Sequence, residues 1–129
     1  MAKLLEGKAI SEKIKEEIKK NVQSLGLKPV LASIQVGENA GAEAYVKSQK
    51  KTAESLGIEY QFNKLDQNTA ESSLIEFIQK LNVDKSVNGI IIQMPLPAQI
   101  DYKKISQFIL PEKDVEGMHP ANIGKIVFG

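Results

Sequence analysis

The stretch Gly89-Ile-Ile-Ile-Gln-Met-Pro-Leu-Pro97 decides how the chain folds. With the residues just before it, it forms the most apolar run of the sequence, and a glutamine and two prolines end that run. A run without alternation is typical of a strand that is buried on both faces of a parallel sheet. We therefore expect a central strand over residues 87–94, with Gln93 at the sheet edge where ligands bind.

Helical and strand periodicities alternate on the amino-terminal side of this strand. Ile10, Ile14 and Ile18 recur at helical spacing and predict an amphipathic helix from about residue 8 to residue 25, ended by Gly26. Asn68 is the expected cap of the third helix. The remaining predictions are strands at 29–36 and 58–65, helices at 41–56 and 68–82, a short helix at 101–109 and mostly loop from residue 111 onward.

This order of elements predicts an α/β fold, a three-layer αβα arrangement with a mainly parallel sheet and right-handed crossovers. The strand at 58–65 is less apolar and is expected nearer a sheet edge. Residues 1–129 should form a single domain, since no repeat or linker interrupts them. Ligands of such sheets bind at the carboxyl ends of the strands, where three segments should gather: residues 37–45, 93–97 and 113–119.

Composition narrows the classes of function. The 129 residues are 42% hydrophobic and 26% charged with a net charge of +1, which is typical of a globular protein rather than a disordered or nucleic-acid-binding one. Cysteine is absent, the first residues lack the apolar core of a signal peptide, and no apolar run approaches about 18 residues. We expect a cytoplasmic protein with no membrane or nucleic acid partner. All 17 basic residues are lysines, so no guanidinium group is present to bind an anion.

Each candidate functional side chain also has a plain structural explanation. Tyr45 fits a half-buried packing residue, and the prolines after Gln93 fit a closed loop. Asp114 and Glu116 fit a solvated turn, and a lone histidine, His119, is weak evidence for a base or a metal ligand. No cluster has metal-site spacing, so no metal is expected, and the common nucleotide and serine hydrolase motifs are absent.

Two late blocks and several shorter motifs resemble those of a known family. The chain is similar to the methylenetetrahydrofolate dehydrogenase/cyclohydrolase family in residues 89–97, in Pro111-Glu-Lys-Asp-Val-Glu-Gly117, in His119-Pro120 and in Asn122-Ile-Gly124. The resemblance extends in the same order over Val36-Gly37, Tyr45-Val46, Lys51 and Gly57-Ile58. It implies the amino-terminal catalytic domain of that family. The Rossmann-type domain that binds NADP follows in the family and is absent from this chain.

The resemblance also implies a reaction. Members of the family oxidise 5,10-methylenetetrahydrofolate to the methenyl form with NADP, hydrolyse that to 10-formyltetrahydrofolate, and are usually dimers through the second domain. They serve one-carbon metabolism and purine biosynthesis. By resemblance, Tyr45 stacks on the folate and Gln93 approaches its reacting region. The substrate-binding residues implied in this way are Tyr45, Gln93, Met94, Pro95, Leu96 and Glu116, and the catalytic ones are Tyr45, Gln49, Gln93 and Glu116.

Three polar positions depart from the family pattern. Glu116 is one methylene longer than the aspartate that holds the pterin, and Ala42 replaces a usual serine. The family places a lysine one helical turn after the tyrosine, where this chain has Gln49. An ammonium group assists proton transfer and stabilises developing charge, which a neutral amide does poorly, so we expect weak or absent cyclohydrolase activity. Hydride transfer mainly requires face-to-face alignment and is compatible with Gln49 in a full-length form.

The chain alone, without an NADP-binding domain, is expected to be inactive. Two alternative functions remain at this point. The chain also fits a catalytically inactive folate-binding module, which would bind folate without turnover, or an unrelated α/β interaction domain, which would show no saturable folate binding.

Overall fold

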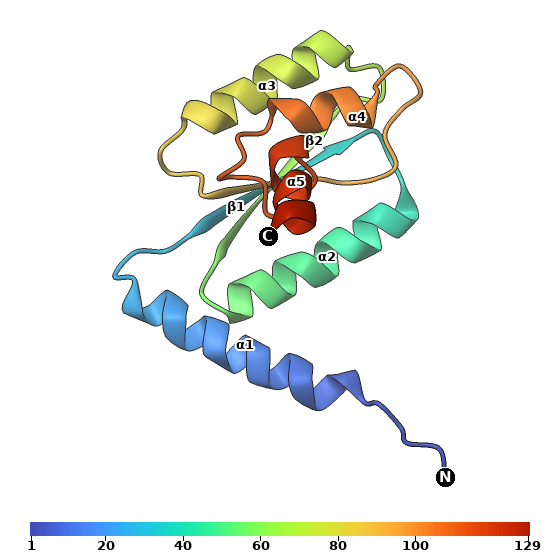
Figure 1. Ribbon diagram of the computed structural model, residues 1–129. Coiled ribbons are helices and arrows are strands. Elements are labelled where there is room, and N and C mark those ends of the chain that lie inside the picture. Colours follow the sequence, from blue (N-terminus) through green and yellow to red (C-terminus); the bar gives the residue numbers. More distant parts are fainter.

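The computed structural model describes residues 1–129 and follows the predicted order of elements. The helices are α1 (Gly7–Ser24), α2 (Ala40–Ser55), α3 (Glu71–Val83), α4 (Tyr102–Ile105) with a 3-10 turn at Ser106–Phe108, and α5 (Pro120–Phe128). The strands are β1 (Val30–Val36), β2 (Glu59–Leu65) and β3 (Gly89–Ile92). All strand pairs are parallel. Figure 1 shows α3 and α4 on one side of the sheet and α2 on the other, so the predicted three-layer α/β fold is confirmed.

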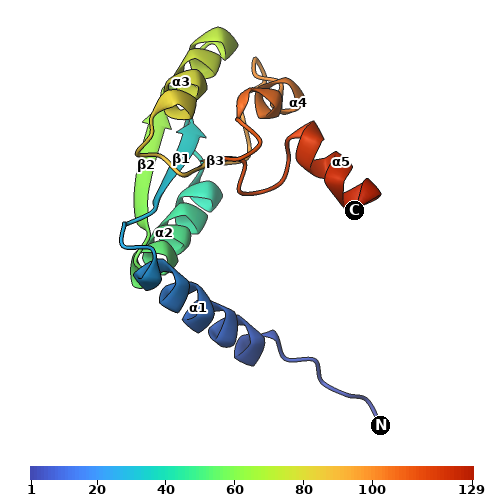
Figure 2. The same ribbon diagram turned by 60° about the vertical axis from the view of Figure 1, so that its left-hand side comes forward.

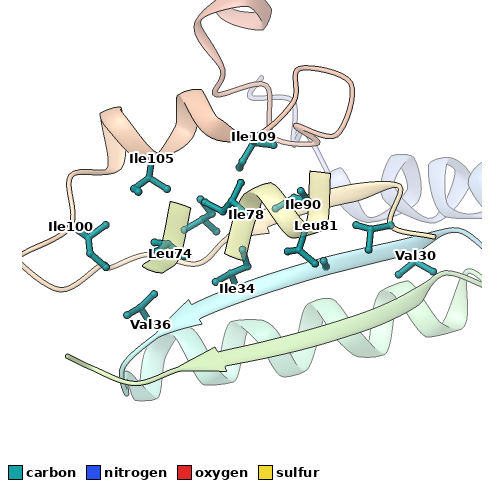
Figure 3. Packing of buried hydrophobic residues seen from close by; sticks show 13 residues of the cluster. Val30, Ile34, Val36, Leu74, Ile78, Leu81, Ile90, Ile100, Ile105 and Ile109 are labelled. Atoms are coloured by element: carbon teal, nitrogen blue, oxygen red, sulfur yellow. The ribbon is translucent and has the colours of Figure 1, made fainter. Parts of the chain in front are cut away.

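The main core lies between the sheet and α3. Alternate residues of a strand point to opposite faces, and Val30, Ala32, Ile34 and Val36 of β1 all point to the α3 side. There they join a cluster of 13 buried residues that includes Leu74, Ile78 and Leu81 of α3 (Figure 3). The α2 side of the sheet has a smaller apolar cluster, whose buried members are Val46, Ala53 and Tyr60. The fold is therefore held mainly from the α3 side.

The prediction that the most apolar strand is central was wrong. The strand order is β2-β1-β3, so β1 is central and β3 lies beside it at the other edge from β2, which is an edge strand as predicted. A loop covers the outer edge of β3, because the backbone N–H of Ile90 donates a 2.8 Å hydrogen bond to the carbonyl oxygen of Lys113. All four residues of β3 are buried. The apolar composition therefore predicted that the strand is buried, but not its position in the sheet.

Two predictions about the helices were wrong, the cap of α3 and the absence of a helix after Pro111. Asn68 does not cap α3, since its backbone N–H donates to Oδ1 of Asp66 in a turn and Ala70 is the N-cap residue. The region after Pro111 was expected to be mostly loop, but it contains α5. His119 caps this helix, because its Nδ1 accepts a 3.0 Å hydrogen bond from the backbone N–H of Ala121, and a proline follows the cap.

Helix α1 is formed as predicted, and it extends away from the rest of the chain (Figure 2). None of its residues is buried, and Ile10 and Ile14 are 64% and 50% exposed. The helix meets the body near its end, where Val22 lies beside the turn at Gly57. Gly26 follows the helix with a φ of 67°, a left-handed conformation that glycine adopts readily and that ends the helix. No helix of the chain has the length and apolar character needed to cross a membrane.

Candidate functional site

A groove between α2 and the sheet contains Tyr45 and Gln49. These residues lie one helical turn apart and therefore share one face of α2. The side chain of Asn39 fixes the start of this helix by accepting a 2.9 Å hydrogen bond from the backbone N–H of Ala42. The groove has a volume of about 370 Å³ and is lined by Leu31, Tyr45, Ser48, Gln49, Thr52, Ala53, Leu56, Ile58 and Ile91. Its mainly apolar walls suit a flat ring system held by a few polar groups.

A larger hollow, of about 470 Å³, lies beside Gly37 and Lys64 and is a weaker candidate. Its lysine is already paired, because Nζ of Lys64 lies 2.9 Å from Glu43 and 3.3 Å from Glu38. These two carboxylates raise the pKa of Lys64. The hollow is mostly polar and contains none of the predicted site residues, so we place the site in the groove.

Gln93 reaches the groove side of the sheet from the end of β3. Its Nε2 donates a 2.8 Å hydrogen bond to Oε1 of Gln49 and a 2.9 Å one to Oγ of Ser33. The phenol of Tyr60 donates to the same Gln49 oxygen at 2.9 Å. We call Ser33, Gln49, Tyr60 and Gln93 the polar quartet. Ser33 has no exposed surface and Gln93 is 3% exposed, so the structure joins two predicted site residues in a network shielded from water.

The polar quartet carries no formal charge. Burial raises the pKa of the Tyr60 phenol, and the nearby polar side chains of Ser33 and Gln93 oppose this only in part. Tyr60 therefore stays protonated at neutral pH and acts as a hydrogen-bond donor. Where an ammonium group would place a positive charge, this chain has an amide joined to a neutral phenol.

Exposure separates the predicted site residues into those open to a ligand and one that belongs to the core. Tyr45 is 59% exposed, which excludes the interpretation of a half-buried packing residue. Met94 and Pro95 are also exposed and are joined by a cis peptide bond. Leu96 instead is partly buried and packs against the main core on the α3 side. Tyr45, Met94 and Pro95 are thus accessible to a ligand, whereas Leu96 stabilises the fold.

Asp114 organises the late loop rather than facing a ligand. Its Oδ2 accepts hydrogen bonds from the backbone N–H of His119 at 2.8 Å and from Nδ2 of Asn122 at 2.9 Å. Burial alone would raise the pKa of Asp114, but these bonds and further backbone N–H groups outweigh it and hold the pKa below its usual value. Nζ of Lys113 donates to the carbonyl oxygens of Leu81, in the last turn of α3, and of Asp84, just after the helix. His119, as the cap of α5, is likewise structural.

Glu116 differs from Asp114 although only two residues separate them. The residue is exposed and none of the chain's hydrogen bonds involves its carboxylate. Partial burial of the carboxyl group, followed by the negative charge of Asp114, raises the pKa of Glu116. Burial raises the pKa of Tyr102, and the negative charges of Glu116 and Asp114 raise it further. Glu116 is therefore a carboxyl group with no partner in the chain.

The expected gathering of three segments at the carboxyl ends of the strands is correct for two of them. Residues 113–119 instead join the sheet beside the first half of β3, where Asp114 forms a parallel bridge with Ile90. A Cβ atom at Gly89 would lie 2.5 Å from Cγ1 of Val115, so only glycine admits this close approach. The free edge of β3 offers backbone hydrogen bonds that draw the loop there. Val115 lies near Leu31, a residue of the groove, and Glu116 follows it.

Ser33 and Tyr60 are site residues that the sequence reasoning missed. Each carries a signal that could have found it. Ser33 is a polar residue in a mostly apolar strand, and buried hydroxyls need partners. Tyr60 is buried in a strand whose other residues are mostly polar or charged. No group of three or more His, Cys, Asp or Glu side chains could hold a metal ion.

Comparisons with known proteins identify the family of the chain. Residues 5–116 match the family described as tetrahydrofolate dehydrogenase/cyclohydrolase, catalytic domain. The chain belongs to this family. It is 44% identical over 131 residues to the bifunctional protein FolD of Aquifex aeolicus, a match that covers 98% of this chain and 45% of that protein.

Solved structures of the tetrahydrofolate dehydrogenase/cyclohydrolase family share the fold. The bifunctional FolD enzyme of Campylobacter jejuni superposes with a TM-score of 0.92 at 42% identity, covering 98% of this chain and 46% of that one. The FolD enzyme of Trypanosoma brucei, solved with NADP cofactor and inhibitor, gives 0.89 at 28% identity and covers 97% and 44%. The chain therefore spans slightly less than half the length of these relatives. Membership of the family also rules out the reading of an unrelated interaction domain.

Proposed function

We propose that residues 1–129 form the folate-binding catalytic domain of an enzyme that oxidises 5,10-methylenetetrahydrofolate to 5,10-methenyltetrahydrofolate. The observation that carries the proposal is the hydrogen bond between Gln49 and Gln93 beside the exposed ring of Tyr45. Tyr45 and Gln49 come from α2 and line an apolar groove, and Gln93 reaches Gln49 from the end of β3. Family membership supports the same substrate class.

Each accessible residue has a role in this proposal. The Tyr45 ring stacks on the flat pterin, since its face is free of packing contacts that would bury it. Gln93 is held by two hydrogen bonds and therefore positions the reacting region of the folate without having to be ordered on binding. Glu116 accepts hydrogen bonds from the N–H groups of the pterin. Met94 and Pro95 provide apolar contacts.

NADP binding belongs, in this proposal, to the part of the longer relatives that the chain does not span. The chain has no glycine-rich dinucleotide motif and no arginine, so its residues do not fit the phosphates of a dinucleotide. NADP, when bound, supplies the hydride acceptor. The residues of this chain hold the folate and exclude water from its apolar face.

Hydrolysis of the methenyl product to 10-formyltetrahydrofolate is weak or absent in our proposal. The attack of water needs proton transfer and stabilised charge, and the polar quartet offers neither an ammonium group nor another charged group. General acid–base assistance is typically worth about a hundredfold to ten-thousandfold in rate. We expect a hydrolysis rate lower by a factor in that range than in relatives with lysine at this position.

The wider setting follows from the same family. We propose a cytoplasmic enzyme of one-carbon metabolism and purine biosynthesis that is a homodimer in its full-length form. A second candidate, a folate-binding module without catalysis, is favoured by one observation, the neutral Gln49. It predicts folate binding without turnover even when an NADP-binding domain is supplied.

Two measurements test these proposals. The chain is fused to the NADP-binding domain of a FolD relative, and both the oxidation and the hydrolysis are assayed. We expect NADP reduction with little hydrolysis, and robust hydrolysis by the Gln49 protein would overturn the second part. Titration of the chain with 5-formyltetrahydrofolate should show saturable binding, and a Tyr45→Ala variant should bind more weakly. Binding without NADP reduction would favour the non-catalytic module.

A further inference from the structure

The hydrogen bonds of the polar quartet define which atoms remain free for a ligand. An amide nitrogen has two protons to donate, and Nε2 of Gln93 uses both, one to Gln49 and one to Ser33. Oε1 of Gln93 accepts no hydrogen bond within the chain. Gln93 is 3% exposed, so little of this amide is open to solvent in the ligand-free chain. Oε1 is the one polar atom of the Gln93 amide that is left without a partner and is free to accept from a ligand.

We propose that Tyr60 and Ser33 are positioning residues that fix the Gln93 amide with its oxygen, an acceptor, toward the substrate, and that Gln49 determines this orientation. The inference rests on the proposed function for the identity of the ligand. It assigns to Gln93 a substrate group that donates a hydrogen bond, such as an N–H of the reduced pterin. The amide arrangement itself is a property of the ligand-free chain.

Gln49 determines the orientation because its Oε1 accepts from two donors at once, at 2.8 Å from Gln93 and 2.9 Å from Tyr60. A lysine ammonium has only donors. Lysine at this position would face the NH₂ group of Gln93 donor to donor, so the amide would rotate by about half a turn to offer its oxygen instead. The NH₂ group would then point to the ligand. Exchange of glutamine and lysine thus reverses the hydrogen-bonding character of a second residue.

Tyr60 holds Gln49 in place from the neighbouring strand. Its ring packs in the smaller apolar cluster and is 6% exposed, and only its hydroxyl group reaches Gln49. Removal of this hydroxyl group leaves the packing of the ring in place. It also leaves Gln49 with one donor instead of two, so the amides of Gln49 and Gln93 gain freedom to rotate. Ser33 restrains the position of the Gln93 side chain from β1 by accepting its second amide proton.

The test follows the side-chain amide protons of Gln49 and Gln93 by NMR in the 129-residue chain, together with its affinity for 5-formyltetrahydrofolate. Tyr60→Phe should shift both sets of amide signals, speed their exchange with water and weaken binding about fivefold. Tyr102→Phe is the matched control, because the Tyr102 hydroxyl makes no hydrogen bond in the chain and lies outside the polar quartet. It should leave the amide signals and the affinity unchanged. Ser33→Ala repeats the test from β1 if Tyr60→Phe fails to fold.

Gln49→Lys provides the sharper result. The Gln93 NH₂ protons should lose their protection from exchange, since the nitrogen now faces the ligand side. Protected Gln93 protons in this variant, or equal effects of Tyr60→Phe and Tyr102→Phe, would overturn the inference. Failure of the unaltered chain to bind the folate would overturn the proposed function alone, because the amide signals of the ligand-free chain report on the polar quartet independently.

Discussion

The two faces of the sheet contrast most clearly at Ile34 and Ser33, neighbours on β1 that are both fully buried. Ile34 points to the α3 side and joins 12 other buried apolar residues. Ser33 points to the α2 side and accepts a hydrogen bond from Gln93. Because strand residues alternate, one strand serves an apolar core and a polar site at the same time. Adjacent residues of one strand therefore serve different purposes, one the stability of the fold and the other the hydrogen bonds of the site.

This separation has a consequence for the site. The α3 side supplies most of the apolar burial, so changes on the α2 side alter chemistry at limited cost to the fold. Gln49 illustrates the point. The residue lies partly exposed on α2 and belongs to no core cluster. A substitution at Gln49 is therefore expected to change the hydrogen bonds of the site more than the stability of the fold.

The largest expected effect on stability comes from a substitution in the apolar core on the α3 side of the sheet. Ile34→Ala should lower the free energy of unfolding by about 2–5 kcal/mol, since it leaves a cavity among packed side chains. Chemical denaturation of the chain measures this loss. Folate affinity of the molecules that remain folded should change little, because the side chain points away from the groove. A loss below the effect of Ser33→Ala would contradict the contrast between the faces.

A smaller effect separates Leu96 from Met94, which lie two residues apart. Leu96→Ala should destabilise the chain by about 1–2 kcal/mol, because its side chain packs against the core. Met94→Ala removes an exposed side chain and should change stability by no more than about 0.5 kcal/mol. Met94→Ala should weaken folate binding, whereas Leu96→Ala should change the folate affinity little. Calorimetric unfolding and a folate titration of both variants would show whether the boundary between core and site is placed correctly.

Ser33→Ala should destabilise by about 1 kcal/mol, the net value of a typical hydrogen bond. The change removes a partner of Gln93, whose second bond to Gln49 remains. Ser55→Ala is the control, since Ser55 is exposed and bonds only to the carbonyl oxygen of Thr52 within its own helix. That control should stay within about 0.5 kcal/mol of the parent protein. Equal denaturation midpoints for the two variants would show that the polar quartet does not stabilise the fold.

The smallest effect concerns Glu116 and has a defined sign. Its pKa is raised in the folded chain, so folding favours the protonated carboxyl group. The contribution to stability is present below the unfolded pKa and is lost as the pH rises through the folded pKa. Glu116→Gln should therefore be slightly more stable than the parent at pH 7, with the difference vanishing or reversing near pH 4. Thermal unfolding at both pH values measures it, and a less stable variant at pH 7 would be inconsistent with the raised pKa.

Several parts of the fold could be predicted because they depend on local periodicity. The helix ended by Gly26, the edge position of β2 and the order of elements follow from side-chain spacing and turn residues. The central place of β3 was predicted wrongly, because an apolar run records burial and the burial came from a loop at its edge. The cap of α3 was misplaced since Asn68 bonds within a turn. The first error comes from a contact between residues that are distant in sequence. The second comes from a local turn that competed with the helix cap for Asn68.

By itself, the sequence determined the α/β class, because periodicity depends on neighbouring positions. Its motifs carried the family resemblance, and the resemblance pointed to Tyr45, Gln49 and Gln93 as candidate site residues. Only the tertiary structure decided that Tyr60 bonds to Gln49 and Ser33 to Gln93, since these four residues meet through the parallel pairing of three strands and the packing of α2. It also decided that Asp114 is a loop-organising residue while Glu116 keeps a free carboxyl group. Hydrogen bonding and burial depend on such neighbours, and the order of residues does not state them.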